Sequence, residues 1–143
     1  MSESENIHLA EQLLDNINQH KVRRNMDYLA PFYQFEFPGA VGPLSRDQSV
    51  NFFQDYITAF PDFHFDIKGK IAQGDFVVFM WIASGTHRGP LRTPTGVILQ
   101  PTERRCTISG CNVYQFKHGQ AVRGWWFWDM VTLFSQLGVM PVF

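Results

Sequence analysis

Residues 104–128, RRCTISGCNVYQFKHGQAVRGWWFW, carry the strongest structural signal in the chain. Strand-forming residues lie on both sides of the segment KHGQ at 117–120, which has the composition of a tight turn. We therefore predict a strand over residues 104–116 and an antiparallel partner over residues 121–128.

Two more strands are predicted upstream of this hairpin. Residues 63–67 (FHFDI) alternate apolar and polar side chains, and residues 76–86 (FVVFMWIASGT) form a long β-rich run after a turn at 73–75. Residues 87–103 contain three of the eight prolines and two glycines, so they are predicted to form a loop at the rim of a pocket. Together these segments predict an antiparallel meander.

The N-terminal part of the chain is predicted to be helical. Ser4 is an available N-cap for a first helix, and a short second helix at residues 22–29 is expected to end before Pro31. The segment SRDQ at 45–48 is a capping box, so a further helix starts there and ends at Pro61. The buried face of the first helix is predicted to be Ile7, Ala10, Leu14 and Ile17.

The remaining segments complete an α+β fold. Residues 33–37 (YQFEF) alternate as a short strand, and Asp129 precedes a last helix at residues 130–137 that Gly138 closes. Helices come first, then strands, then one closing helix. This order predicts a curved antiparallel sheet with the N-terminal helices packed on one face, in a single domain spanning residues 1–143.

The composition argues against several classes of protein. The chain is 45% hydrophobic and 15% aromatic, which indicates a large aromatic core, and its net charge of −1 argues against a nucleic acid or an anionic membrane as partner. No apolar run reaches the roughly 18 to 20 residues of a membrane span, and the polar N-terminus is unlike a signal peptide. Cys106 and Cys111 are interpreted as reduced thiols, so we expect a cytoplasmic protein.

Motifs that hold nucleotides or metals do not occur in the sequence. It has no G-x-S-x-G nucleophile turn, no phosphate-binding glycine loop and no G-x-G-x-x-G. The histidines at 8, 20, 64, 87 and 118 contain no close pair spaced as metal ligands. We therefore expect no cofactor and no metal, and an apolar small molecule as ligand of the aromatic interior.

Four further segments occur in a specific order along the chain: FPDF at 60–63, GTHRG at 85–89, PTG at 94–96, and D-x6-QLG at 129–138. With the hairpin, they resemble the SnoaL-like polyketide cyclases of the nuclear transport factor 2-like superfamily over nearly the whole chain. The resemblance implies a cone-shaped, cystatin-like α+β barrel with a deep pocket. It also implies a homodimer through the outer face of the sheet and ring closure by intramolecular aldol condensation without a cofactor.

The chain departs from these cyclases at their catalytic acid/base. The cyclases carry an Asp seven residues after the hairpin glycine, and the same count from Gly119 reaches Trp126. Their supporting Gln and His fall on Gly110 and Asn112. An indole cannot remove a proton next to a carbonyl, whereas Asn112 can polarise an oxygen. The sequence therefore argues against the usual aldol mechanism.

Three other residues are candidate bases. Asp129 adjoins an aromatic cluster, and desolvation there would raise its pKa, although an N-cap is the favoured interpretation of an Asp before an apolar helix. His87 either points into the mouth of the pocket or hydrogen-bonds to the following turn. Glu36 points inward or outward according to the parity of its strand. Asn112 would orient or polarise a substrate oxygen.

Strand parity divides the aromatic residues at the end of the hairpin. Residues 122, 124, 126 and 128 are predicted to face the pocket, and residues 121, 123, 125 and 127 to face outward, where we expect the dimer contact. Trp126 is interpreted either as core or as a wall on which a ligand ring stacks. The predicted substrate-binding residues are Trp126, Trp128, Tyr114, Tyr33, Phe35, Trp81 and Glu36.

These observations predict a cofactor-free enzyme that acts on an apolar, cyclic or polyketide-like small molecule. Its chemistry would be proton transfer, in a cyclisation, isomerisation, dehydration or hydrolysis. One alternative is a non-catalytic carrier that stacks an apolar ligand on Trp126 and Trp128. The other is a dimeric interaction module whose outer face carries Trp125 and Phe127.

Overall fold

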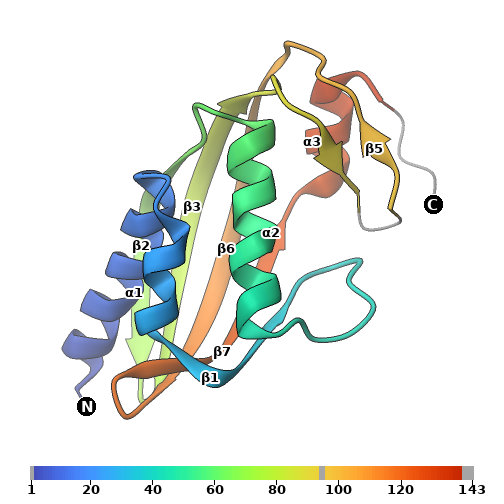
Figure 1. Cartoon of the computed structure of the whole chain (residues 1–143). Helices are drawn as coiled ribbons and strands as arrows, with labels where there is room; N and C mark the ends of the chain where they lie inside the picture. Colours follow the sequence, from blue (N-terminus) through green and yellow to red (C-terminus); the bar gives the residue numbers. More distant parts are fainter. Residues whose placement is uncertain (1, 94–95, 140–143) are drawn as a thin grey trace.

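The computed structural model describes residues 2–93 and 96–139 (Figure 1). Five strands form the main sheet in the order β1-β7-β6-β3-β2, and two short strands form a second sheet. The strands are β1 (Leu29–Glu36), β2 (His64–Gln73), β3 (Phe76–Thr86), β4 (Leu91–Arg92), β5 (Ile98–Leu99), β6 (Arg105–Lys117) and β7 (Gln120–Trp128). The helices are α1 (Glu3–Asn18), the 3₁₀ helix η1 (Val22–Asp27), α2 (Arg46–Ala59) and α3 (Met130–Leu137).

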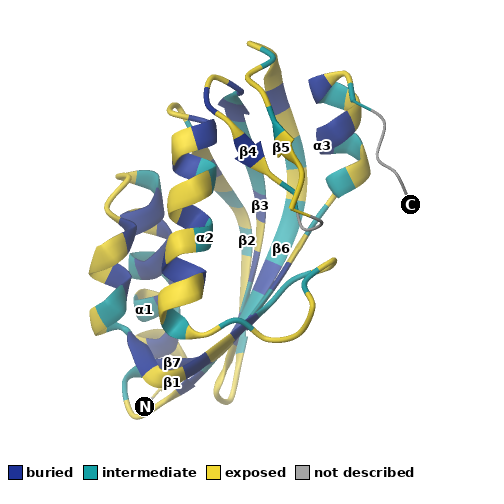
Figure 2. Cartoon of the chain, turned by 45° about the vertical axis from the view of Figure 1, so that its right-hand side comes forward, coloured by how far each residue is buried: buried dark blue, intermediate teal, exposed yellow. Residues whose placement is uncertain are grey.

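The helices α1 and α2 cover one face of the curved sheet, and α3 packs near one end of it (Figure 1). Their apolar sides are buried, while the opposite sides of α1 and α2 are exposed (Figure 2). Buried side chains of α1, α2 and the sheet meet in a main core, among them Leu13 of α1, Phe53 of α2 and Phe79 of β3. A second, smaller core lies under α3 and includes Leu91 and Leu133. The predicted α+β fold, with N-terminal helices on one face of a curved sheet, is confirmed.

One edge of the sheet differs from the predicted antiparallel meander. The edge strand β1 pairs in parallel with β7, which places Phe35 beside Gly124 and Glu36 beside Trp125. The other neighbouring strands of the main sheet are antiparallel, as predicted. Parallel neighbours need a long crossover connection, and here α2 and five strands, β2 to β6, lie between them in the chain. The apolar pattern of a strand does not encode the direction of its partner.

The N-terminal segment corrects two predictions. Ser2 rather than Ser4 caps α1, because the hydroxyl of Ser2 accepts the backbone N–H of Glu5 at 3.1 Å while the Glu5 carboxylate accepts from Ser2. The second helix is the short 3₁₀ helix η1, and β1 then runs through Pro31. A proline lacks the N–H for a strand ladder and is tolerated because β1 is an edge strand.

The predicted alternation in β7 holds only after its first residues. Ala121, predicted to face outward, is fully buried. A register shift opposite Gln115 and Phe116 leaves one residue of β7 unpaired, so the parity changes there. Beyond this bulge Trp126 is buried and Phe127 is exposed, as predicted.

The loop predicted at residues 87–103 contains β4 and β5. Pro94 and Thr95, part of the segment PTG, lie outside the described residues. Over the ranges 2–93 and 96–139, no helix is long and apolar enough to cross a membrane.

Candidate functional site

An aromatic cleft of about 40 Å³ lies between α2 and the inner face of the sheet. All ten of its lining residues are apolar or aromatic, and they come from α2, from the main sheet and from the turn before β2. Its floor consists of the buried side chains Phe53, Phe65, Trp81, Ala83 and Trp126. Its mouth consists of the half-buried side chains Phe52, Tyr56, Phe63, Ile108 and Trp128.

Trp126 is the largest fully buried side chain of the described residues. Its ring centre lies 4.8 Å from that of Phe53, 5.5 Å from that of Phe65 and 5.9 Å from that of Trp81. A fourth ring, that of Tyr114, lies 6.0 Å away in an edge-on arrangement. These spacings are typical of favourable aromatic contacts. Trp126 is therefore a core residue, as one interpretation of the sequence held, and its side chain also forms part of the floor of the cleft.

Asn112 lies behind the floor and does not line the cleft. Its side-chain oxygen accepts the indole N–H of Trp81 at 3.0 Å, while its amide nitrogen is buried without a hydrogen-bond partner. Gly110, directly across from Trp81 in the sheet, leaves room for that indole, since a Cβ at this position would overlap the ring. Asn112 thus fixes the orientation of Trp81 and, through it, the shape of the floor.

Tyr33 and Tyr114 line a second, smaller cavity of about 10 Å³ deeper in the cone. Burial raises the pKa of both hydroxyls. The ionised form of one would also repel the other, which further raises the pKa of Tyr33. Both hydroxyls are therefore protonated at neutral pH, so neither serves as a base.

Asp129 does not have the raised pKa that desolvation would have given it. Its carboxylate is exposed and accepts the backbone N–H of Thr132 at 2.9 Å and the hydroxyl of the same residue at 2.5 Å. These two hydrogen bonds lower the pKa of Asp129. The carboxylate is the N-cap of α3 and lies outside the cleft, so the favoured interpretation is confirmed and the pKa prediction is wrong.

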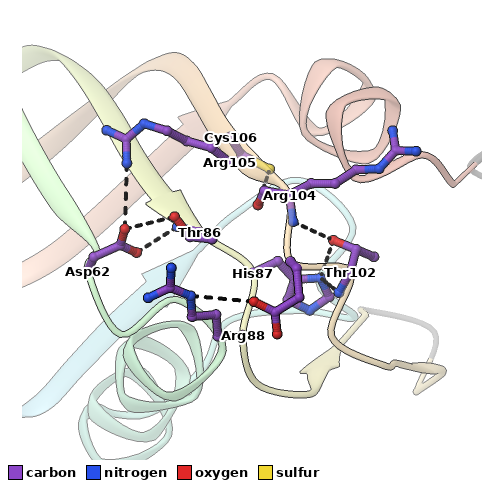
Figure 3. Close-up of polar contacts among 9 residues, drawn as sticks. Asp62, Thr86, His87, Arg88, Thr102, Arg104, Arg105 and Cys106 are labelled. Carbon is purple, nitrogen blue, oxygen red and sulfur yellow. Dashed lines mark hydrogen bonds and ion pairs between the residues drawn. The ribbon is translucent and has the colours of Figure 1, made fainter.

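His87 is fully buried at the base of the loop, where Figure 3 shows it beside Thr102. Its Nδ1 accepts the backbone N–H of Thr102 at 3.2 Å, and its ring packs against Phe60 at 5.4 Å between ring centres. Burial lowers the pKa of His87. His87 therefore does not point into the mouth of the aromatic cleft, and its ring hydrogen-bonds across the loop to Thr102 rather than to the turn that directly follows.

The same region explains the segment FPDF at 60–63. The carboxylate of Asp62 accepts the backbone N–H of Thr86 at 2.6 Å and its hydroxyl at 2.9 Å, and Arg105 lies 3.5 Å away (Figure 3). Burial raises the pKa of Asp62, but these contacts outweigh it, and the pKa is lowered. Asp62 thus connects the turn after α2 to the ends of β3 and β6. Its role is structural, and it does not line the cleft.

Glu36 and Phe35 do not line the cleft. Glu36 follows the outward parity of β1 and sits beside Trp125, so it faces the side of the sheet opposite the cone. Phe35 is fully buried behind the lining residues Phe52 and Phe53, with ring centres 5.3 and 5.5 Å from theirs. Of the seven predicted substrate-binding residues, the cleft is lined by Trp81, Trp126 and Trp128.

Seven of the ten residues that line the cleft were not predicted as site residues. Phe52 and Tyr56 are four residues apart on α2, beside the apolar stripe that contains Phe53. That spacing was a usable signal, because such residues share one helix face. Ala83 and Ile108 carry no chemical signal in the sequence, and their place in the cleft depends on how β3 and β6 pair.

The described residues contain no group of three or more His, Cys, Asp or Glu side chains placed to hold a metal ion. The cone of curved sheet and helices, with an aromatic cleft at its centre, is that of the nuclear transport factor 2-like fold. The chain belongs to the SnoaL-like polyketide cyclase family, whose model matches residues 7–137. No curated protein matches the chain.

Solved structures share this fold over almost their full length. AclR from Streptomyces galilaeus, a proposed hydroxylase, is 24% identical with a TM-score of 0.84, over 98% of this chain and 100% of that chain. IdmH from Streptomyces antibioticus, a proposed polyketide cyclase, is 25% identical with a TM-score of 0.78, over 94% and 99%. A proposed polyketide cyclase from Acidithiobacillus ferrooxidans is also 25% identical with a TM-score of 0.78, over 96% and 98%.

Proposed function

We propose that this protein is a cofactor-free enzyme that binds an apolar, ring-containing or polyketide-like small molecule in the aromatic cleft. Its reaction is a ring closure, isomerisation or dehydration. The observation that carries the proposal is the cleft itself, a concave site whose ten lining residues are apolar or aromatic. The family supports the substrate class, as do the neighbours IdmH and the Acidithiobacillus protein.

The proposed contribution of the protein to the reaction is positioning rather than proton abstraction. Asp129, His87 and Glu36 do not line the cleft, and burial raises the pKa of Tyr56, its one hydroxyl-bearing residue. A methylene between two carbonyl groups loses its proton readily in water, so a polyketide-like substrate can supply its own carbon nucleophile. Holding the two reacting carbons together then removes much of the entropic barrier.

The cleft must widen to admit a ring. A cavity of about 150 Å³ accommodates benzene, whereas this cleft has about 40 Å³. The side chains at the mouth, Phe52, Tyr56 and Trp128, are half-buried, and side chains near a surface change rotamer rapidly. Ring insertion is therefore proposed to displace mouth residues while the floor stays in place.

Binding is tested with an acetylnaphthalene, monitored by tryptophan fluorescence. We expect saturable quenching, because Trp81, Trp126 and Trp128 line the cleft. Ile108→Lys places a cation at the mouth and is expected to weaken binding by at least about tenfold. Ser109→Lys is the matched control. Ser109 is the exposed residue next to Ile108 in β6, and its side chain points away from the cleft. Equal binding by both variants would place the ligand elsewhere.

Catalysis is tested with an aryl triketone whose activated methylene closes a six-membered ring onto the third carbonyl, forming one carbon–carbon bond and releasing water. We expect the protein to accelerate closure, and the ratio of the catalysed to the uncatalysed rate to be flat between about pH 6 and 8. Ionisation of the substrate changes both rates alike, and no cleft residue titrates in this range. A sigmoidal profile centred in this range would contradict the positioning mechanism. Tight binding without acceleration would favour the second candidate function, a non-catalytic carrier. The absence of a base among the described cleft residues also supports a carrier.

We also propose that two copies of the chain associate through the outer face of the sheet. Exposed apolar side chains lie there on β3 and β7, including Phe76, Met80 and Phe127, and Met80 and Phe127 share one row across β6. The central row of Met80, Cys111 and Phe127 carries no charge. A second copy can therefore pack against this row without bringing like charges together. Contiguous exposed apolar surface of this kind is typical of interfaces.

Phe127→Lys is expected to convert the dimer to a monomer at micromolar concentration, because it places a charge at the centre of the proposed interface. Sedimentation velocity measures the change. Val41→Lys is the control, since Val41 is a fully exposed apolar residue in the loop before α2. A wild-type protein that sediments as a monomer would refute the dimer.

A further inference from the structure

Two cavities inside the cone adjoin each other at Phe53. The outer one is the aromatic cleft, and the inner one, of about 10 Å³, is lined by polar as well as apolar residues, including Tyr33, Ser49 and Tyr114. The hydroxyl of Tyr33 occupies the space beside Gly124, where a Cβ would overlap it. The inner cavity is therefore a polar end to an otherwise apolar cone.

Two aromatic side chains stand between these cavities. Phe53 lines both of them, and Trp126 lies against Phe53 with 4.8 Å between ring centres. On its other side Trp126 meets Tyr114 of the inner cavity, edge-on at 6.0 Å. Phe53 and Trp126 together thus form the partition, and Trp126 occupies the strand position at which the resemblance implies a catalytic Asp.

Two buried donors at the partition have no hydrogen-bond partner among the described residues. The indole N–H of Trp126 is buried without a hydrogen-bond partner, although it lies close enough to Tyr114 to oppose part of the effect of burial on that hydroxyl. The amide nitrogen of Asn112, directly across from Trp126 in the sheet, is also buried and unpartnered. Buried donors normally find an acceptor, so this part of the cone is suited to a ligand oxygen.

We infer that Trp126 determines ligand length, by closing the cone between an outer cleft for one apolar ring and an inner chamber suited to a polar ligand end. With Trp126 in place, a ligand binds only in the outer cleft and its far end gains nothing from Tyr33 or Tyr114. A smaller side chain at this position joins the two cavities and admits a longer ligand with a terminal hydroxyl or carbonyl. This inference rests on the proposed ligand-binding function of the cleft.

The test compares toluene, biphenyl and para-phenylphenol by isothermal titration calorimetry. For the wild-type protein, biphenyl and para-phenylphenol are expected to bind within about twofold of each other, because the hydroxyl does not reach the inner chamber. In Trp126→Leu, the affinity for para-phenylphenol is expected to rise by at least about tenfold relative to toluene, since a second ring is buried and its hydroxyl meets Tyr33. Trp125→Leu, the same change on the outward-facing neighbour, is expected to leave the order of affinities unchanged.

A second variant tests whether ligands pass Trp126 in a protein that keeps this residue. Its result does not depend on whether Trp126→Leu folds. Tyr33→Phe removes one hydroxyl of the inner chamber and is expected to leave para-phenylphenol binding unchanged. Weaker binding by Tyr33→Phe would show that ligands already pass Trp126 and would overturn the inference. So would a Trp126→Leu protein that keeps the wild-type preference.

The two proposals fail in different ways. If the wild-type protein binds none of the probes while Trp126→Leu binds para-phenylphenol, the partition is supported and the proposed function of the native cleft is wrong. If the wild-type protein binds all three and Trp126→Leu shows no gain, the cleft is supported and the role of Trp126 is wrong. If neither protein binds any probe, both proposals are wrong.

Discussion

Trp126→Ala is expected to lower the free energy of unfolding by about 3–5 kcal/mol, the range for truncation of a fully buried large aromatic side chain. The indole contacts four rings, those of Phe53, Phe65, Trp81 and Tyr114. These rings come from a helix and three strands, which limits how far they can collapse into the space left. Urea denaturation followed by far-ultraviolet circular dichroism measures the loss.

Trp125→Ala is the control for this substitution. Trp125 is adjacent in sequence but half-buried on the outer face, where Arg123 lies 5.7 Å from its ring centre. Its truncation is expected to cost much less, because no enclosed cavity results. If both variants lost the same stability, the indole of Trp126 would not be the centre of the core.

Asn112→Asp is expected to destabilise the protein by about 3–5 kcal/mol at pH 7, the cost typical of an uncompensated buried charge. Asn112 is fully buried, and its single partner is the indole N–H of Trp81. Burial would raise the pKa of the new carboxyl above the value of about 3.9 in the unfolded chain. The loss in free energy of unfolding should therefore be small below about pH 4 and grow as the pH rises from there. It should level off above the pKa of the carboxyl in the folded protein.

Urea midpoints at pH 4 and pH 7, each compared with wild-type protein at the same pH, test this dependence. Asn51→Asp is the control, because Asn51 is exposed on α2 and its replacement adds the same charge to the surface. An Asn112→Asp protein as stable as wild type at pH 7 would mean that water reaches the floor of the cleft. A penalty that did not change with pH would exclude charge burial as its cause.

The sequence predicts those residues of the candidate site whose direction depends only on alternation within one strand. Trp81, Trp126 and Trp128 were predicted to line the pocket and do so, because alternation along a regular strand is a local property. Glu36, whose direction the sequence left open, faces outward, and Phe35 is buried behind the lining residues Phe52 and Phe53 rather than in the lining itself. The parallel pairing of β1 with β7 orients both residues, and that pairing joins segments far apart in the chain.

The surroundings of the candidate bases also could not be predicted from the sequence. Asp129 adjoins aromatic residues in sequence, yet the backbone turns at the start of α3 and leaves its carboxylate in solvent. His87 was left between two arrangements, and a contact with Thr102, fifteen residues away, decides between them. Neither desolvation nor a hydrogen-bond partner across a loop can be read from neighbouring residues.

The sequence by itself determined the α+β class, the order of elements, the capping box before α2, the hairpin of β6 and β7, and the family resemblance. All of these rest on local periodicity, turn chemistry and short segments at fixed spacing. The tertiary structure alone decided that Trp126 separates two cavities and that the named bases lie outside the cleft. Burial, cavity shape and pKa depend on groups brought together from distant parts of the chain, and the aromatic residues that predicted a large core also fill much of the cone in which a ligand would bind.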